Sequence, residues 1–437
     1  MSTFPAPSKP LKVLTIDGGG LQAIPSLLIL NKLLDTIAHN NNNVKEAKPR
    51  PCDVFDVICG IGSGGWLAIM LGRFRMDITA ALAEWYNLIE CIKPQSTQEE
   101  MIMRLMKRSY YDRQRLVEQV DEMTDMYDAG KFMYLPPSED CRCKHVFVAA
   151  LKASSKDENL NYGLFRTYDT PSDRRLLDGF SDPRHCMISD AFSATGAAKW
   201  FTPPWKGKNG KFKFQDTHFP SPHNITDLAV NEVWGLYGNQ VAMSIIVNIG
   251  PGLPNAADIK HIARRFSWGS SAVNISTSLA RRHNNVDKGH AEAINTSNMP
   301  MDVTSNDPLK ARTTCATNHT SSPTSPTDTQ GMTKKTSSTR YDSFGSEKDL
   351  QQEKKLRFRE DEIENKVRTK LRNVYQASAP PYYRLAPPTS PLGSAQNDTA
   401  VPRRALKTTE AYLAQGPVGG IMEEASRLID YSVAVQA

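Results

Sequence analysis

Two short apolar segments that each run into a cluster of glycines constrain the fold of this chain more than any other feature. The first is LKVLTI (11–16), followed by Asp17-Gly18-Gly19-Gly20, and the second is VFDVIC (54–59), followed by Gly60-Ile61-Gly62-Ser63-Gly64-Gly65. Helical spacing follows each cluster, over 21–38 and through WLAIMLGRF (66–74). A β-branched apolar run that ends in glycine predicts a buried strand entering a tight turn. Two such units in succession predict an α/β domain with a mostly parallel sheet.

The alternation of strands and helices continues beyond these two units. Strands are predicted at 144–151, 162–168 and 241–249, and helices at 77–92, 187–200 and 225–238, while 212–215 leads to Asp216. The alternation ends near residue 255, which predicts a main domain over 11–255, preceded by a disordered N-terminus at 1–10.

The composition changes after this point. Over 301–345, 18 of 45 residues are Ser or Thr, so this stretch has too few apolar side chains to offset the entropy of ordering. We therefore expect a low-complexity, mostly disordered insertion at 256–349, with the disorder itself at about 285–348. Order is predicted to return in a helical part at 350–437, with helices at 349–376, 405–414 and 421–436.

Bulk properties narrow the class of protein. A formal charge of +6 is small for 437 residues, and the basic runs are too short to indicate nucleic-acid binding. The seven cysteines and nine histidines lack disulfide or metal-ligand spacing, so no metal and no cofactor are predicted. The N-terminus has no apolar signal segment, and no run reaches the ~18 apolar residues of a membrane span. The expected location is the cytoplasm, with peripheral contact to membranes at most.

The glycine clusters indicate what chemistry the domain could carry. Backbone amides of Gly18, Gly19 and Gly20 at the start of a helix could bind an acyl-transfer oxyanion or a phosphate, or could simply form a tight turn. The second cluster, Gly-x-Gly-Ser-Gly-Gly between a strand and a helix, has the layout of a nucleophile elbow. Such an elbow holds its apex residue at positive φ, so its neighbours must be small.

With both loops in place, the chain resembles the patatin-like phospholipases. The resemblance is carried by LTIDGGG (14–20), FDVICGIGSGGWLAIMLGR (55–73), LFRTYD (164–169), ISDAFSATGAAKWFTPP (188–204) and FQDTHF (214–219), in the family's order, and by YYRL (382–385). It covers 11–255 and resumes at 350–437. It implies a three-layer α/β/α fold, and lipid acyl hydrolysis by a serine–aspartate dyad with Gly18, Gly19 and Gly20 as the oxyanion hole.

The departures from the family's pattern concern the dyad. The elbow of the family reads Gly-x-Ser-x-Gly-Gly, so Gly62 takes the place of the serine, between Gly60 and the pair Gly64 and Gly65. Ser63 follows one residue later and is a weak substitute, because an apex there would place β-branched Ile61 where a small residue is needed.

The aspartate of the dyad matches Asp216, but Thr217 and His218 replace the small residues that follow it in the family. Without a serine, Asp216 has no proton to accept, and capping nearby backbone is its alternative role. The family's Arg-Gly after the first glycine loop is also missing, because Leu21 and Gln22 stand there.

Three functions are compatible with this sequence. The first is a catalytically impaired patatin-like protein of lipid metabolism that binds a lipid, an acyl chain or a protein partner. The second is an active lipid acyl hydrolase, similar to phospholipase A2, that uses Ser63 and Asp216. The third is a regulatory or scaffold protein that binds a protein partner through its Ser/Thr-rich insertion at 256–349, where phosphorylation could act as a switch.

Overall fold

A computed structural model represents the whole chain. It describes residues 5–19, 23–40, 48–102, 111–136, 142–152, 162–170, 182–198, 202–207, 213–214, 224–252, 347–387 and 400–429. Of the stretches predicted to be disordered, the N-terminus lies outside these ranges only at residues 1–4, whereas 285–346 of the insertion lies wholly outside them, as do Gly20 and Asp216.

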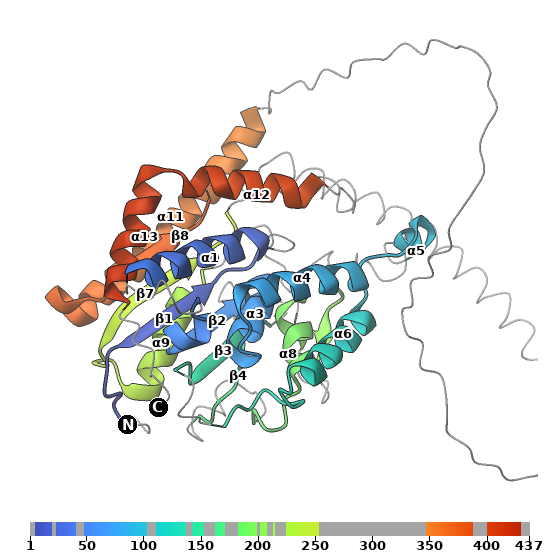
Figure 1. Cartoon of the computed structure of the whole chain (residues 1–437), viewed down its shortest axis with the longest axis horizontal. Helices are drawn as coiled ribbons and strands as arrows, with labels where there is room; N and C mark the ends of the chain where they lie inside the picture. The colour runs from blue at the N-terminus through green and yellow to red at the C-terminus, as the bar shows by residue number, and fades with distance from the viewer. Residues whose placement is uncertain are drawn as a thin grey trace, which may run out of the picture. The chain divides into compact units, whose positions relative to one another are not determined.

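A six-stranded sheet forms the centre of the molecule (Figure 1). Its strands are β1 (Leu11–Ile16), β2 (Val57–Ile61), β3 (His145–Leu151), β4 (Tyr162–Arg166), β7 (Met243–Ile249) and β8 (Tyr382–Leu385), in the order β4-β3-β2-β1-β7-β8. All neighbouring pairs are parallel except β3 and β4, which are antiparallel. A separate two-stranded sheet pairs β5 (Trp205–Lys206) with β6 (Lys213–Phe214).

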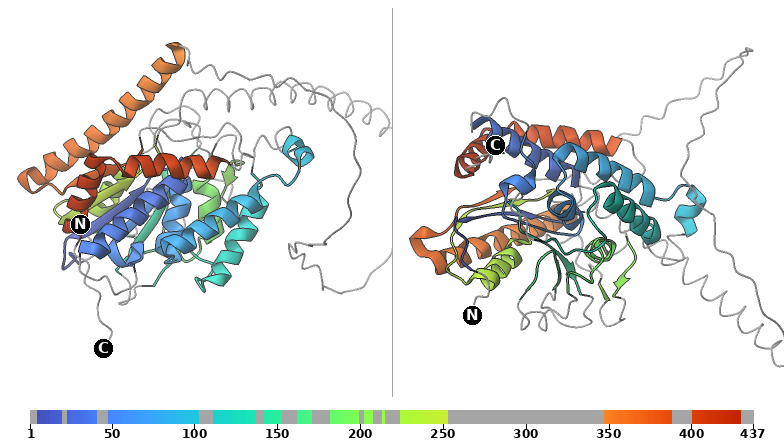
Figure 2. Two further views of the ribbon diagram at one scale, coloured as in Figure 1. Left: turned by 45° about the horizontal axis from the view of Figure 1, so that its top comes forward. Right: turned by 60° about the horizontal axis from the view of Figure 1, so that its bottom comes forward.

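Helices cover both faces of the sheet (Figure 2). The longer ones are α1 (Ala23–Asn40), α4 (Ile78–Ile92), α6 (Arg113–Met126), α8 (Ile188–Thr195), α9 (Thr226–Tyr237), α11 (Glu347–Tyr375), α12 (Ala400–Leu413) and α13 (Gly416–Leu428). The shorter ones are α2 (Pro51–Val54), α3 (Ser63–Ala68), which continues as a π-helix over Ile69–Arg73, α5 (Thr97–Ile102) and the 3-10 turn Gln376–Ser378.

The pleat of the strands decides which helices pack on which face. On β1, Leu14 and Ile16 lie in the same hydrophobic cluster as α1, α4, α8 and α13, whereas Leu11 and Val13 lie with α9 and α11. Successive side chains of a strand point to opposite faces, so both faces of a parallel strand must be apolar. This is why the central strands read as continuous apolar runs. The fold is the three-layer α/β/α architecture with a mostly parallel sheet that the sequence predicts.

The segment after the insertion completes this domain. β8 extends the sheet by pairing in parallel with β7, from Ile246 opposite Tyr382 to Ile249 opposite Leu385. On the apolar face of α11, Val367 and Leu371 are buried against the sheet, while α12 and α13 both pack on α1. The sheet is therefore built from residues on both sides of 253–346.

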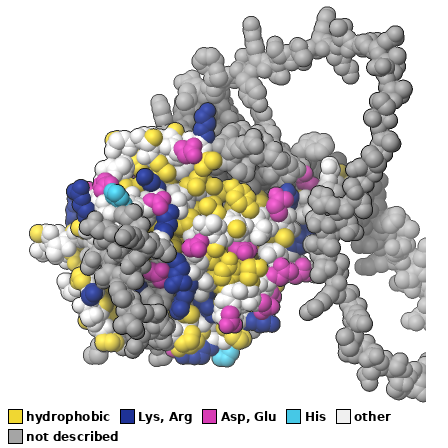
Figure 3. Space-filling model, in the orientation of Figure 1, with side chains coloured by type: hydrophobic (Ala, Val, Ile, Leu, Met, Phe, Trp, Pro, Cys, Tyr) yellow, Lys and Arg dark blue, Asp and Glu magenta, His cyan; other side chains and the backbone are white. Residues whose placement is uncertain are grey.

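The face seen in Figure 1 is formed largely by the helical layer that holds α1 and α4. Figure 3 shows hydrophobic side chains gathered in the middle of this face, with acidic side chains around them. Tyr86 of α4 and Leu406 of α12 are each 42% exposed. Among the described residues, no helix combines the length and apolar character needed to cross a bilayer.

Candidate functional site

The candidate site lies where three neighbouring parallel strands end. Gly18 and Gly19 follow β1, Gly62 follows β2, and Pro251 follows β7. A Cβ atom placed on Gly19 would lie 2.2 Å from the ring of Pro251, and one on Gly18 would lie 2.7 Å from the carbonyl oxygen of Ile61. The first glycine loop is thus enclosed by its two neighbours. The carboxyl ends of parallel strands are the usual place for ligand sites in α/β folds.

Gly62 forms the bend between β2 and α3. Its backbone has φ +60° and ψ −132°, which side-chain-bearing residues adopt only under strain. Its amide donates a hydrogen bond to Oγ1 of Thr195 at 2.9 Å, and that hydroxyl donates to the carbonyl of Ala149 on β3 at 2.6 Å. Helix α8 therefore fixes the bend to the sheet through a single threonine.

The other glycines of the elbow are required by packing. A Cβ atom on Gly60 would lie 2.0 Å from the carbonyl oxygen of Gly64, and one on Gly64 would lie 2.3 Å from that of Ile16. On Gly65 it would lie 2.5 Å from Oγ1 of Thr195. Gly62 differs, because the nearest atom to its Cβ position is the Cα of Gly18 at 3.5 Å, an ordinary contact distance. The bend thus has room for a side chain, and the chain carries none there.

Ser63 is the first residue of α3 and is only 7% exposed. Its hydroxyl oxygen accepts a hydrogen bond from the backbone amide of Gly19 at 3.0 Å. An acyl-transfer oxyanion would need amides of this glycine loop as its donors. The serine side chain therefore occupies one of the donors that the resemblance assigns to the oxyanion.

Asp216 and Gly20 both lie outside the described residues, so the structure gives no position for either side chain or backbone. The same holds for Thr217 and His218. The nearest described part of that segment is β6, which ends at Phe214, a fully buried side chain. The proposed roles of Asp216 and Gly20 stay predictions.

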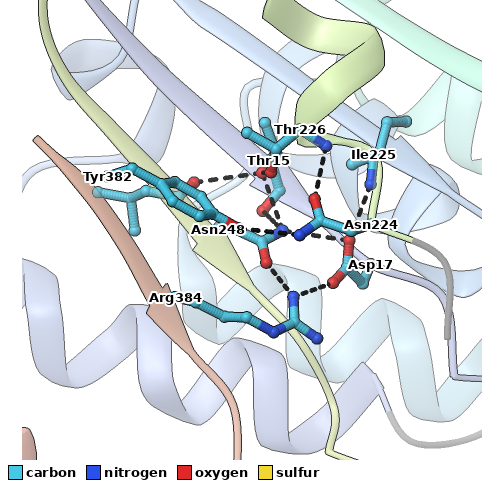
Figure 4. Close-up of polar contacts among 9 residues, drawn as sticks. Thr15, Asp17, Asn224, Ile225, Thr226, Asn248, Tyr382 and Arg384 are labelled. Atoms are coloured by element: carbon cyan, nitrogen blue, oxygen red, sulfur yellow. Dashed lines mark hydrogen bonds and ion pairs between the residues drawn. The ribbon is translucent and has the colours of Figure 1, made fainter. Parts of the chain in front are cut away.

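A buried ion pair lies directly beneath the first glycine loop, and sequence reasoning missed it (Figure 4). Asp17 is 4% exposed, and its Oδ2 atom lies 2.5 Å from the guanidinium of Arg384 on β8. Its Oδ1 atom accepts hydrogen bonds from the amide of Ile225 and from the side chain of Asn248, both at 3.1 Å. Both carboxylate oxygens therefore have partners, as a buried charge requires.

Asn248 of β7 links this pair to the centre of the sheet. Its side-chain oxygen accepts a hydrogen bond from Arg384, and its side-chain nitrogen donates to Oγ1 of Thr15 at 2.9 Å. Thr15 in turn shares a hydrogen bond with Thr226, at the start of α9, at 2.9 Å. The network joins β1, β7, β8 and α9 (Figure 4). Its sequence signal is an Asp directly before the glycines and an Arg in YYRL.

Comparison with known proteins gives short matches to one class of enzyme. Patatin-like phospholipase 1 of Plasmodium falciparum (isolate NF54) is 32% identical over 82 residues, 19% of this chain and 12% of that protein. The mouse calcium-independent phospholipase A2-gamma is 36% identical over 75 residues, 17% of this chain and 8% of the relative. Phospholipase A I of Arabidopsis thaliana is 28% identical over 95 residues, 22% of this chain and 6% of the relative.

The matched segments thus span a small part of each relative's length, and no family model matches the chain. The matches nevertheless agree with one another, because each of these relatives is named a phospholipase. On these grounds the chain is similar to the patatin-like phospholipases over the matched segments.

Proposed function

We propose that this chain is a patatin-like protein of lipid metabolism that has lost its catalytic nucleophile and acts by binding lipid. The observation that carries the proposal is Gly62, at the bend where the family has its serine, with a positive φ and room for a side chain. Losing the serine of a hydrolase costs ~10⁶-fold in kcat, or about 8 kcal/mol of transition-state stabilisation. Nothing in the described part of the loop compensates for a loss of that size.

The contact of Ser63 supports the same interpretation. Its hydroxyl accepts a hydrogen bond from Gly19, so it is held toward the oxyanion loop at a position one residue past the bend. A nucleophile must attack a substrate carbonyl whose oxygen is bound by these amide donors, so the donors have to be free of the nucleophile itself. Ser63 in this position both lacks the geometry of attack and removes a donor.

A lipid is the ligand class we favour, because each of the relatives above is named a phospholipase. The first glycine loop keeps its enclosure by Ile61 and Pro251, and the ion pair of Asp17 with Arg384 holds it from below. A loop that is fixed on three sides retains the shape of a binding site after the chemistry is gone.

Covalent labelling of the full chain with a fluorophosphonate probe, alongside a short-chain ester assay, tests the loss of the nucleophile. We expect no label on the wild type and an ester rate equal to that of the matched control, Ser63→Ala. Gly62→Ser, whose side chain has room, should become labelled even if its turnover is low. Labelling of the wild type that disappears in Ser63→Ala would contradict the proposal and support the hydrolase that uses Ser63 and Asp216.

Lipid binding needs a separate measurement, because a chain without a nucleophile could also bind a protein partner. Sedimentation with phosphatidylcholine vesicles, and binding of a fluorescent fatty acid, should both report an interaction. Absence of both would overturn the lipid part of the proposal. It would then favour a partner bound through 256–349, most of which lies outside the described residues, and deletion of 285–346 should abolish that partner's binding.

A further inference from the structure

A cavity of about 680 Å³ lies at the opposite end of the sheet from the glycine loops. Leu11 and His145, which line it, are the first residues of β1 and β3, whereas the glycine loops follow the last residues of β1 and β2. Because β1, β2 and β3 are parallel, the two places are separated by the length of the strands. The volume falls within the range of small-molecule sites, roughly 300–1,000 Å³.

The charges around this cavity do not balance. Two carboxylates line it, and each is paired with a guanidinium: Asp56 lies 3.0 Å from Arg142, and Asp169 accepts hydrogen bonds from both terminal nitrogens of Arg184. Three further cations also line it: Lys9, Arg75 and Lys144. Among the residues that the structure describes, none of these three has a carboxylate partner. The cavity therefore carries uncompensated positive charge.

Arg75 is the most unusual of the three cations. It has φ +57°, a left-handed conformation that costs a residue with a side chain about 1–2 kcal/mol. Its Nε atom is buried and makes no hydrogen bond within the described part of the chain. Buried polar groups nearly always have a partner. Arg75 therefore lines the cavity with a side chain that the described part of the chain leaves unsatisfied, and a ligand could supply its missing partner.

A neighbouring arginine shows what the ordinary structural role would look like. The guanidinium of Arg73 is buried and donates to the backbone carbonyls of Phe132, Met133 and Tyr134, where it fastens one wall of the cavity. Burial, and then the charge of Arg75, lower the pKa of Arg73 to about 10. The two guanidinium groups therefore repel each other, and only Arg73 is satisfied by the protein. An anion beside Arg75 would relieve this repulsion.

The remaining walls are aromatic and apolar. Tyr168 and Tyr237 line the cavity together with Leu135 and Pro136, so a planar or apolar group could lie beside the cations. A single carboxylate would balance only one of three positive charges, whereas a phosphomonoester carries nearly two negative charges at neutral pH and presents three acceptor oxygens. Arginine binds phosphate through two parallel hydrogen bonds, which a guanidinium with free donors can supply.

We propose that this cavity is a binding site for a phosphomonoester, with the phosphate on Arg75, Lys9 and Lys144 and the organic part against Tyr168 and Tyr237. The site is separate from the glycine loops and does not depend on the proposed function. Its ligand could be a small soluble phosphomonoester or the headgroup of a lipid such as phosphatidic acid, since both present the same group.

Calorimetric titration of the full chain with phenyl phosphate, with phenol as the neutral control, tests the proposal. The decisive variant is Arg75→Gly, because glycine adopts positive φ without cost and so removes the guanidinium while relaxing the backbone. We expect at least tenfold weaker binding of phenyl phosphate and a melting temperature no lower than that of the wild type. Arg372→Gln, which removes an exposed guanidinium on α11, is the matched control and should leave binding unchanged.

The outcomes are distinguishable. The proposal would be overturned if neither phenyl phosphate nor vesicles containing phosphatidic acid bind the wild type. It would also be overturned if both bind Arg75→Gly as well as they bind the wild type. Vesicle binding that is lost in Arg75→Gly, without binding of phenyl phosphate, would identify the lipid headgroup as the source of the phosphate. Neither result involves the ester assay. The phosphomonoester site can therefore be disproved without affecting the proposed loss of the nucleophile, and the loss of the nucleophile can be disproved without affecting this site.

Discussion

At the scale of single residues, the elbow contains glycines that are there for different reasons. Gly64 is enclosed by backbone atoms of β1, with the Ile16 carbonyl oxygen 2.3 Å from the place a Cβ atom would take, whereas Gly62 has space around it but a positive φ. The first constraint is steric overlap with backbone atoms, which can be relieved only by a shift of the chain, and the second is a conformational preference. The two constraints differ in size.

We therefore expect Gly64→Ala to destabilise the protein more than Gly62→Ala. The strain of a side chain at the conformation of Gly62 costs about 1–3 kcal/mol, whereas Gly64→Ala adds to the overpacking penalty a forced shift of β1 or β2. Urea unfolding followed by far-ultraviolet circular dichroism measures both free energies of unfolding. Equal losses, or a larger loss for Gly62→Ala, would show that the bend is packed differently from this description.

His145 predicts how stability depends on pH. Its ring is buried against Tyr168 and Tyr237, and burial lowers its pKa to about 4, against the partial opposition of Glu232 and with a further lowering by Lys144. Below pH 6.5, the ordinary pKa of histidine, the unfolded chain binds a proton at this ring, whereas the folded chain does not bind it until the pH nears 4. This contribution to stability is therefore complete above pH 6.5 and is lost as the pH falls toward 4.

The expected size follows from about 1.36 kcal/mol per pH unit for one proton. Between pH 7 and pH 5, His145→Phe should lose about 2 kcal/mol less stability than the wild type, because an aromatic ring is kept and the titration is removed. Denaturant unfolding at the two pH values gives the comparison, with the exposed His39→Phe as the control. The same pH dependence in wild type and His145→Phe would rule out this origin.

At the scale of elements, β8 contributes a charge as well as an edge to the sheet. Arg384 reaches the carboxylate of Asp17 at the end of β1, and both side chains are at least 90% buried. Removing one partner of a buried pair leaves an uncompensated charge and typically costs about 3–5 kcal/mol, whereas removing both costs less. The pair should therefore behave as a unit.

A double-mutant cycle tests this coupling. We expect Arg384→Met to destabilise by about 3–5 kcal/mol, and Asp17→Asn with Arg384→Met to be less destabilised than the sum of the single changes. Free energies of unfolding of the four proteins give the interaction term. Additive effects would mean that the two side chains do not depend on each other. The more exposed pair Arg50 and Asp53 offers a control whose coupling should be below about 1 kcal/mol.

Most of the elements can be predicted from local pattern, and the misses have local reasons. The predictions for β1, β3, β7 and α4 agree with the structure within one or two residues, because each is a long apolar run or a clear helical stripe. The second strand is predicted at 54–59, but β2 begins at Val57. Residues Pro51–Val54 form a helical turn instead, with proline at its first position and Asp53 bonded back to Arg50.

Helix α6 is missing from the predictions, although the sequence carries its signals. Asp112 caps its first turn by accepting hydrogen bonds from the amides of Gln114 and Arg115, and the helix buries Leu116, Val120 and Met123 at helical spacing. The residues between them are mostly charged or amide-bearing, so the segment as a whole is polar and the helical spacing of its apolar residues is hard to recognise. The antiparallel direction of β4 also cannot be predicted from local sequence, since pairing direction depends on contacts distant in the sequence.

The candidate site also contains features that local sequence predicts and features that it does not. The bend at Gly62 is readable because a motif of adjacent residues forms it, whereas the pairing of Asp17 with Arg384 joins residues 367 positions apart in the chain. No local pattern encodes such a contact. The hydrogen bond between Gly19 and Ser63 is of the same kind, because it depends on the spacing of two loops across neighbouring strands.

At the scale of the whole molecule, one compact unit is formed by two separate stretches of chain, before residue 275 and after residue 344. The first stretch alone would expose the edge of β7 and the face of α1 that α12 and α13 cover, and would leave Asp17 without Arg384. Exposed apolar strand edges favour aggregation, and a buried unpaired charge is unstable. The two stretches should therefore need each other.

We expect fragments 1–274 and 345–437 to be poorly soluble when expressed singly and to form a stable one-to-one complex when expressed together. The physical reason is that β8 recovers its parallel pairing with β7 only when the second fragment is present, and the helices α12 and α13 then cover α1. Size-exclusion chromatography with light scattering measures the complex, and its thermal melt should resemble that of the intact chain, lowered because association is no longer intramolecular. As a control, Arg384→Met in the second fragment should weaken the complex, since it removes the partner of Asp17. A soluble, folded first fragment that ignores the second would show that the sheet ends at β7, and that the chain after the insertion is an independent part of the protein.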